Sequence, residues 1–183
     1  MENYIIETER LALRELTMND FQPWYQILSD QETMQHYPRA FDRDKTRSWI
    51  DWNLDNYSRY GFGLWAIILK ETNLFIGDCG ITMQNIYGDG NLLPEIGYHI
   101  DKRFWCKGYA SEAAKACLGY AFENTDFDEI FSYQKWTNTP SKKVAEKMGM
   151  SLREEYADEK NTKTSVYSIT RAEFYAMIKR IQR

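Results

Sequence analysis

The chain has 183 residues, of which 43% are hydrophobic and 27% charged, and its formal net charge is −4 at pH 7. These proportions are typical of a soluble globular protein, and the length suits one domain, so we expect residues 1–183 to form a single domain. The negative charge disfavours nucleic-acid binding, which usually needs a basic surface. We also expect no membrane partner and a cytoplasmic location, because no apolar stretch approaches the roughly 18 residues of a membrane span and the N-terminus does not resemble a secretory signal.

The cysteine and histidine content predicts no metal site. Three cysteines, Cys79, Cys106 and Cys117, occur without a CxxC motif, and the only histidines are His36 and His99. Three cysteines cannot all pair, and their spacing does not match a zinc site. We therefore expect reduced thiols and no bound metal, and we assign neither histidine side chain a catalytic role.

The first third of the chain predicts a strand followed by two helices. Residues 11–16 alternate as in a short strand, and Thr17 and Asp20 then resemble a capping box. A helix should follow, because Phe21, Trp24, Tyr25 and Leu28 recur at helical spacing. A second helix is expected from Arg43 to Arg59. Its predicted apolar face consists of Trp49, Ile50, Asn53, Leu54 and Tyr57.

The rest of the chain predicts a sheet interleaved with helices. Segments rich in Ile, Leu and aromatic residues predict an antiparallel meander. Its strands are Phe62–Lys70, Leu74–Asn85 and Leu93–Ile100. A helix with a face of small residues, a strand, a short helix, a hairpin and a final helix should follow. Their ranges are Gly108–Asn124, Glu129–Trp136, Ser141–Met148, Ser151–Tyr156 with Thr164–Thr170, and Arg171–Ile181. This order predicts an α/β (α+β) fold with a mixed, mostly antiparallel sheet flanked by helices.

A strand, a basic loop and a helix N-terminus follow one another between residues 95 and 113. Helix N-termini expose unpaired N–H groups and carry partial positive charge, so this junction suits a phosphate or pyrophosphate. Lys102, Arg103 and Lys107 add positive charge. The chain has no GxxxxGK[ST] motif, and its GxG at 61–63 precedes a strand instead of following one. Walker-type and dinucleotide-binding sites are therefore not supported.

Residues 105–110, Trp-Cys-Lys-Gly-Tyr-Ala, resemble the (Q/R)xxGx(G/A) signature of the GNAT superfamily of acyl-CoA-dependent N-acyltransferases. Residues 7–14, 95–98 and 138–150 extend the likeness and are similar to the RimJ/RimL-like branch of ribosomal-protein N-acetyltransferases. Two positions depart from the signature, because Trp105 replaces Gln or Arg and Cys106 replaces a frequent glycine. The motif binds mainly through backbone N–H groups, so we expect phosphate binding to survive both changes unless the Cys106 side chain blocks the approach.

The resemblance implies a GNAT-like twisted sheet and acetyl-CoA as cosubstrate, without a metal. The CoA pyrophosphate would bind successive amides from Lys107 to Ser111, and Gly108 would let the backbone come close. Free amides at the end of strand 95–100 would pair with the pantetheine arm, and Asn138 would contact CoA. Residues 138–141 also fit an ordinary helix N-cap, and both roles can coexist. The predicted cofactor-binding residues are Tyr98, His99, Ile100, Lys107, Gly108, Tyr109, Ala110, Ser111 and Asn138.

Two residues are predicted to be catalytic. The attacking amine must be neutral, and Glu95 is the predicted general base, acting directly or through a water, with a solvent-facing strand glutamate as the alternative interpretation. Ser141 is the predicted proton donor to the departing thiolate, with Tyr98 or Tyr109 as the alternative. Cys106 is disfavoured as a covalent nucleophile, because the family transfers the acyl group directly in a ternary complex.

The predicted activity is acetyl transfer to a primary amine, either a peptide N-terminus or a small-molecule amine. A non-catalytic acyl-CoA-binding or sensing module is the alternative. The expected partner is the amine acceptor, and a homodimer is a possible assembly. Five aromatic residues are candidates to line the acceptor pocket, although core packing explains most aromatic residues in any domain of sheets and helices. These residues are Tyr37, Trp49, Trp52, Trp65 and Trp136.

Overall fold

A computed structural model describes residues 3–159 and 161–181. Its strands are β1 (Ile6–Glu7), β2 (Leu11–Glu15), β3 (Leu64–Leu69), β4 (Leu74–Gln84), β5 (Leu93–Ile100), β6 (Glu129–Lys135), β7 (Ser151–Asp158) and β8 (Thr162–Thr170). Its helices are α1 (Phe21–Leu28), α2 (Arg43–Tyr60), α3 (Tyr109–Asn124), α4 (Thr139–Lys147) and α5 (Arg171–Ile181), with short 3-10 turns η1 (Met18–Asp20) and η2 (Lys102–Phe104). Every predicted element is present with ends within about two residues of those expected, and β1 is the strand that the pattern missed.

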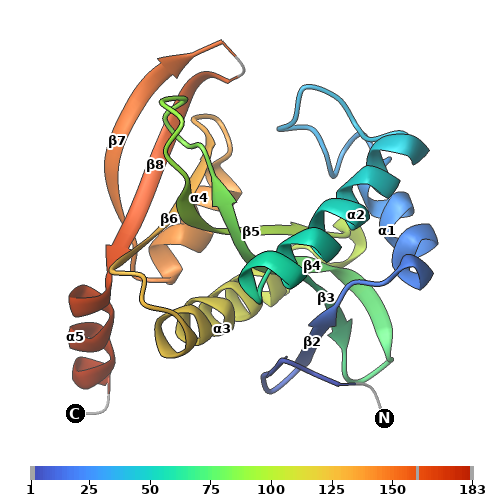
Figure 1. The fold of residues 1–183 in the computed structure, drawn as a ribbon, viewed down its shortest axis with the longest axis horizontal. Coiled ribbons are helices and arrows are strands. Elements are labelled where there is room, and N and C mark those ends of the chain that lie inside the picture. Colours follow the sequence, from blue (N-terminus) through green and yellow to red (C-terminus); the bar gives the residue numbers. More distant parts are fainter. Residues whose placement is uncertain (1–2, 160, 182–183) are drawn as a thin grey trace.

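The strands form one sheet in the order β1-β2-β3-β4-β5-β6-β8-β7. Neighbouring strands are antiparallel except for β5 and β6, which run parallel. The predicted mixed, mostly antiparallel sheet is therefore confirmed. Figure 1 shows β5 at the centre, with β2, β3, α1 and α2 on one side and β6, β7, β8 and α5 on the other. None of the described helices combines the length and the apolar character needed to cross a membrane.

Helices pack on both faces of β3, which is buried along its whole length. Leu64, Ala66 and Ile68 point to one face and join the core cluster of α1 and α2. Trp65 and Ile67 point to the other face and pack with α3. The face of α3 that covers the sheet consists of small and apolar residues, as predicted. Its buried members are Ala113, Ala114, Cys117, Leu118, Ala121 and Phe122.

The buried face of α2 is more polar than its apolar pattern predicts. Leu54 is exposed, whereas Asn53 is fully buried. The Oδ1 atom of Asn53 accepts a hydrogen bond from the Leu64 amide at 2.8 Å, and its Nδ2 donates to the Trp49 carbonyl at 2.8 Å. Asn53 thus satisfies one backbone group of β3 and one of α2, whereas Leu54, the next residue, reaches solvent.

The sheet divides between β5 and β6. These strands pair at Glu95 and Phe131, whereas β6 pairs with β8 along its whole length from Glu129 to Lys135. Beyond Glu95, the edge of β5 that faces β6 has no partner strand in the described part of the chain. The divergence leaves main-chain hydrogen-bonding groups of β5 free for an extended ligand.

Candidate active site

The connection between β5 and α3 turns sharply at two residues with left-handed backbone. Cys106 has φ 60°, and Gly108, the N-cap of α3, has φ 84°. The first amide to bond back within α3 is that of Glu112, which donates to the Gly108 carbonyl at 3.0 Å. The amides of residues 107–111 precede it, and helix geometry leaves the first helical amides without an intrahelical acceptor. The predicted cradle residues Lys107, Gly108, Tyr109, Ala110 and Ser111 are thus brought together at one helix N-terminus.

Arg10 fixes this loop from the N-terminal side. Its Nε atom lies 2.6 Å from Glu112 Oε2, and its Nη1 donates to the Lys107 carbonyl at 3.0 Å. Burial raises the pKa of Glu112, but hydrogen bonds from Thr8 and Arg10 lower it further than burial raises it, so Glu112 stays ionised. Without Arg10, this carboxylate in the first turn of α3 would repel an anion at the helix N-terminus. The sequence placed residues 7–14 in the family likeness but did not predict Arg10 as part of the site.

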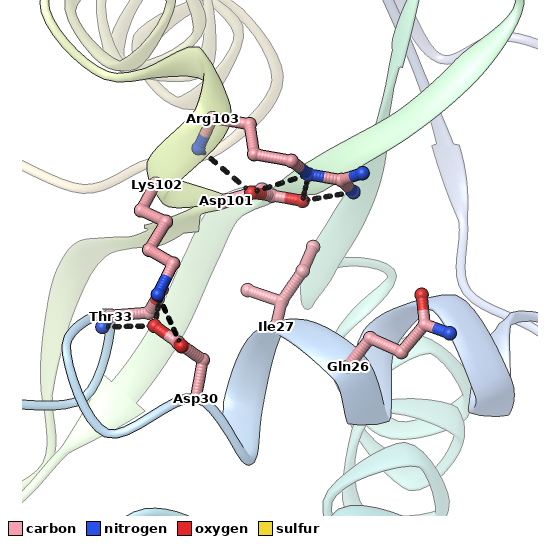
Figure 2. A pocket seen from close by; sticks show the side chains of 7 residues that line it. All are labelled: Gln26, Ile27, Asp30, Thr33, Asp101, Lys102 and Arg103. Carbon is pink, nitrogen blue, oxygen red and sulfur yellow. Dashed lines mark hydrogen bonds and ion pairs between the residues drawn. The ribbon is translucent and has the colours of Figure 1, made fainter.

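Two of the three basic residues of the loop are paired with carboxylates. Lys102 Nζ lies 2.7 Å from Asp30 and 3.1 Å from Glu32, and Arg103 forms an ion pair with Asp101. Figure 2 shows both pairs beside the small open pocket near the end of α1, which is lined by Gln26, Ile27, Asp30, Thr33, Asp101, Lys102 and Arg103. Arg10 is likewise paired, with Glu112, so the predicted positive charge for a phosphate falls mainly to Lys107.

Glu95 occupies the middle of the sheet, on the face of β5 that points towards α1 and α2. Thr82 on β4 donates a hydrogen bond to its carboxylate at 3.0 Å. Burial raises the pKa of Glu95 to about 7, although the Thr82 bond and the charge of His99 partly oppose the rise. Gly97, two residues along the same face, leaves room for the carboxylate, whose Oε2 lies 3.2 Å from where a Cβ of residue 97 would be. A carboxylate with a pKa near 7 suits a general base at neutral pH.

The opposite face of β5 brings Tyr98 to the start of α4. Asn138 caps this helix, because its Oδ1 accepts a hydrogen bond from the Ser141 amide at 3.2 Å. The Tyr98 hydroxyl lies 3.5 Å from the Ser141 carbonyl oxygen. Burial raises the pKa of Tyr98, so the phenol keeps its proton and can donate it in a hydrogen bond. Tyr109 instead lies under the Arg10 guanidinium, 4.5 Å from ring centre to Cζ. Of the two tyrosines considered as alternative donors, only Tyr98 lies beside Ser141.

The side chain of His99 belongs to a buried chain of hydrogen bonds. Its Nδ1 lies 3.0 and 3.1 Å from the two carboxylate oxygens of Asp78, and its Nε2 lies 2.8 Å from the Tyr37 hydroxyl. Asp78 has no exposed surface and also accepts a hydrogen bond from the Trp24 indole at 2.6 Å. Sequence reasoning assigned His99 no side-chain role and missed Asp78 and Thr82. The signal for Asp78 was an acidic residue within the apolar run 74–81.

The aromatic residues considered for the acceptor pocket occupy different environments. Trp65 is fully buried and packs against Tyr120 of α3, so the prediction that it lines a pocket is wrong. Trp49 and Trp52 pack against each other and against the α1–α2 core. Tyr37 and Trp136 reach the surface, with 42% and 47% of their areas exposed. Two of the five candidates are thus clearly accessible from solvent.

Comparison with known proteins defines the class. Residues 10–151 match the acetyltransferase (GNAT) domain. The uncharacterized protein YkkB of Bacillus subtilis (strain 168) is 38% identical over 144 residues, which cover 78% of this chain and 83% of YkkB. The fold, the site and these matches define an acyltransferase. The chain belongs to the acetyltransferase (GNAT) family and is an acetyltransferase enzyme, as predicted.

Solved structures support the same assignment. An acetyltransferase of the GNAT family from Bacillus anthracis is 28% identical and superimposes with a TM-score of 0.75, covering 90% of this chain and 97% of that one. RimL, a ribosomal L7/L12 alpha-N-protein acetyltransferase solved in complex with coenzyme A, shares the fold with a TM-score of 0.75 at 17% identity, covering 92% and 98% of the two chains. RimL thus has the same fold as this chain. Among the described residues, no group of three or more His, Cys, Asp and Glu side chains could hold a metal ion.

Proposed function

We propose that this protein transfers an acetyl group from acetyl-CoA to a primary amine, which is a peptide N-terminus or a small-molecule amine, and that residues 1–183 act as one catalytic domain. The observation that carries the proposal is the arrangement around β5. A carboxylate with a pKa of about 7 lies on one face of the strand, and the hydroxyl of Tyr98 lies beside Ser141 on the other. The unpaired amides at the start of α3 follow directly along the chain.

The described residues fit acetyl-CoA at two points. The amides of residues 107–111 suit a pyrophosphate, and a Cβ at Gly108 would meet only the Arg10 guanidinium, at 3.4 Å. Gln134 lies on β6 beyond the point where β5 and β6 part, and its buried Nε2 has no hydrogen-bond partner in the described part of the chain. A buried donor without a partner costs about 1–3 kcal/mol. A carbonyl oxygen of the pantetheine arm would satisfy it. Acetyl-CoA supplies the thioester that the reaction consumes.

The residues around β5 can accept the proton that the amine loses and donate the proton that the departing thiolate takes up. The bond from the amine nitrogen to the acyl carbon forms as the carbon–sulfur bond breaks. Glu95 takes the proton that the amine nitrogen loses and returns it to solvent. A hydroxyl, from Ser141 or from Tyr98 beside it, donates to the departing thiolate and is reprotonated from solvent. Backbone amides on the free edge of β5 polarise the thioester carbonyl before the attack.

The alternative is an acyl-CoA-binding module without turnover, and one assay separates the two. The purified protein is incubated with acetyl-CoA and benzylamine, putrescine or tetrapeptides that begin with Ser, Ala or Met, and the free thiol of CoA is measured. An enzyme releases thiol in proportion to the acetylated amine. Micromolar affinity for acetyl-CoA without any amine-dependent thiol release would establish the binding module.

The Ser141→Ala variant should lower kcat by about tenfold while the Kd for acetyl-CoA stays within about twofold, because the hydroxyl acts on charge that develops only in the transition state. Tyr98→Phe is the matched comparison, since it removes the other hydroxyl at the same place. Steady-state kinetics and calorimetry on both variants identify the donor as the one whose loss lowers kcat. A rise in Kd without a fall in kcat would make Ser141 a binding residue or a helix-capping residue.

A further inference from the structure

The loop between α1 and α2, residues 29–42, is held at three places, one of which is on β5. Met34 is buried in the α1–α2 core, and Asp30 forms the ion pair with Lys102 that is drawn in Figure 2. Tyr37 makes the third contact, through its hydroxyl to His99. After Tyr37, the Phe41 amide donates to the Leu28 carbonyl at 2.8 Å, so the loop is fixed on both sides of Tyr37.

The tautomer of His99 follows from its partners. The Asp78 carboxylate can only accept hydrogen bonds, so neutral His99 carries its proton on Nδ1 and donates it to Asp78. Burial lowers the pKa of His99, but the Asp78 carboxylate raises it further. Nε2 lies 2.8 Å from the Tyr37 hydroxyl oxygen, and it accepts from that hydroxyl when the ring is neutral and donates to that oxygen when the ring is protonated. The Tyr37 oxygen keeps lone pairs that can accept a hydrogen bond from an incoming group. Asp78 and His99 thus fix the direction in which Tyr37 accepts.

Glu95 and His99 share one face of β5, separated by Gly97, which has no side chain. Tyr37 reaches solvent, with 42% of its area exposed. Burial raises the pKa of Tyr37, and Glu95 is the charge that raises it most, ahead of Asp78. The Glu95 carboxylate extends over Gly97, with Oε2 3.2 Å from the position of a Cβ there, and the Tyr37 oxygen lies 2.8 Å from the His99 ring on the same face of β5. Both groups thus lie on the side of the strand that carries the predicted base.

We infer that the Tyr37 hydroxyl is a second hydrogen-bond acceptor for the substrate amine, and that His99 and Asp78 are positioning residues which orient it. A neutral primary amine has two N–H groups and one lone pair. One N–H donates to Glu95 and the other to Tyr37, which leaves the lone pair directed at the thioester. A secondary amine has a single N–H and cannot make both bonds, so Tyr37 selects primary amines. This inference rests on the proposed function and adds a specificity-determining residue to it.

The test compares the most active primary amine of the panel above with its N-methyl derivative. Tyr37→Phe should lower kcat/KM for the primary amine about five- to tenfold, the size expected for one hydrogen bond, and change kcat/KM for the N-methyl amine less than twofold. Tyr175→Phe is the control, because Tyr175 is similarly exposed and lies on α5. His99→Gln retains a polar atom towards Tyr37 and should keep part of the preference for the primary amine. The Kd for acetyl-CoA should not change in Tyr37→Phe or in Tyr175→Phe.

The outcomes separate the two proposals. If the parent protein acetylates no amine, the proposed function is wrong. If the parent is active but Tyr37→Phe lowers both rates by the same factor, or lowers neither, the inference about Tyr37 is overturned and the proposed function stands.

Discussion

Replacing Glu95 with glutamine should lower kcat by about 10²-fold while the Kd for acetyl-CoA stays unchanged. Glutamine keeps the size of the side chain and can still accept the hydrogen bond from Thr82, but it cannot take a proton from the amine. A factor of about 10² is typical for the loss of a general base. Steady-state kinetics and calorimetry on the folded variant measure the two effects separately. Equal rates in parent and variant would make Glu95 a structural strand residue.

The pH profile of the same variant is a sharper test. Glu95 works as a base only when ionised, so kcat/KM of the parent should rise as the pH increases through about 7. The variant should lack this rise and follow deprotonation of the amine alone, so that high pH partly restores its rate. An unchanged profile would show that another group, or water, takes the proton.

Folding stability supplies a control that does not depend on turnover. The pKa of Glu95 is raised by burial above its ordinary value of 4.5, so the folded state holds this proton more tightly than the unfolded state. Its contribution to the free energy of unfolding is therefore complete below about pH 4.5 and is lost as the pH rises towards 7. The stability of Glu95→Gln relative to the parent should increase over this window. A constant difference between pH 4 and pH 8 would contradict the buried carboxylate.

Replacing Gly108 with valine should raise the Kd for acetyl-CoA by about 10- to 100-fold. Each charge-assisted hydrogen bond to the pyrophosphate is worth about 1.5–3 kcal/mol, and the valine methyl groups would occupy the approach to the amides. Residue 108 also has left-handed backbone, with φ 84°, which costs a β-branched residue about 1–2 kcal/mol. Calorimetric titration of acetyl-CoA gives the Kd, and thermal unfolding reports whether the variant is folded.

Gly61→Val separates occlusion of the cradle from backbone strain. Gly61 has φ 77° and no atom within 4 Å of a Cβ at that position, and it ends α2 far along the chain from the cradle. The Gly61→Val variant should lose about as much folding stability as Gly108→Val, and it should bind acetyl-CoA as tightly as the parent does. Equal losses of affinity in both variants, or none in Gly108→Val, would contradict the assignment of residues 107–111 to the pyrophosphate.

Local sequence patterns predicted the helices and strands well, because the formation of each helix or strand depends mainly on residues that are neighbours in the chain. The small face of α3 and the capping glycine of α2 are visible within a few residues, and both occur as expected. The strand β1 was missed, since two residues are too few to show an alternation. Helix α4 begins two residues earlier than predicted, at Thr139, because Asn138 is its N-cap and Pro140 fits its first turn.

The candidate site was predictable only where residues act through local backbone or through the family likeness. Glu95, Gly108 and Ser141 belong to motifs that can be found along the chain. The chain of Asp78, His99 and Tyr37 cannot, because Tyr37 and His99 are 62 positions apart and meet only when the α1–α2 loop packs on β5. The loop lysine Lys102 shows the converse case: its charge is evident in the sequence, but its carboxylate partners are distant in the chain.

A crystal structure of the protein with coenzyme A tests the central claim most directly, because it locates both ends of the cofactor relative to β5. We expect the pyrophosphate oxygens within hydrogen-bond distance of the amides of residues 107–111, the pantetheine arm along the free edge of β5, and the sulfur beside Ser141 and Tyr98. Coenzyme A bound elsewhere on the surface, or a sulfur remote from these two hydroxyls, would contradict the proposed arrangement of the active site.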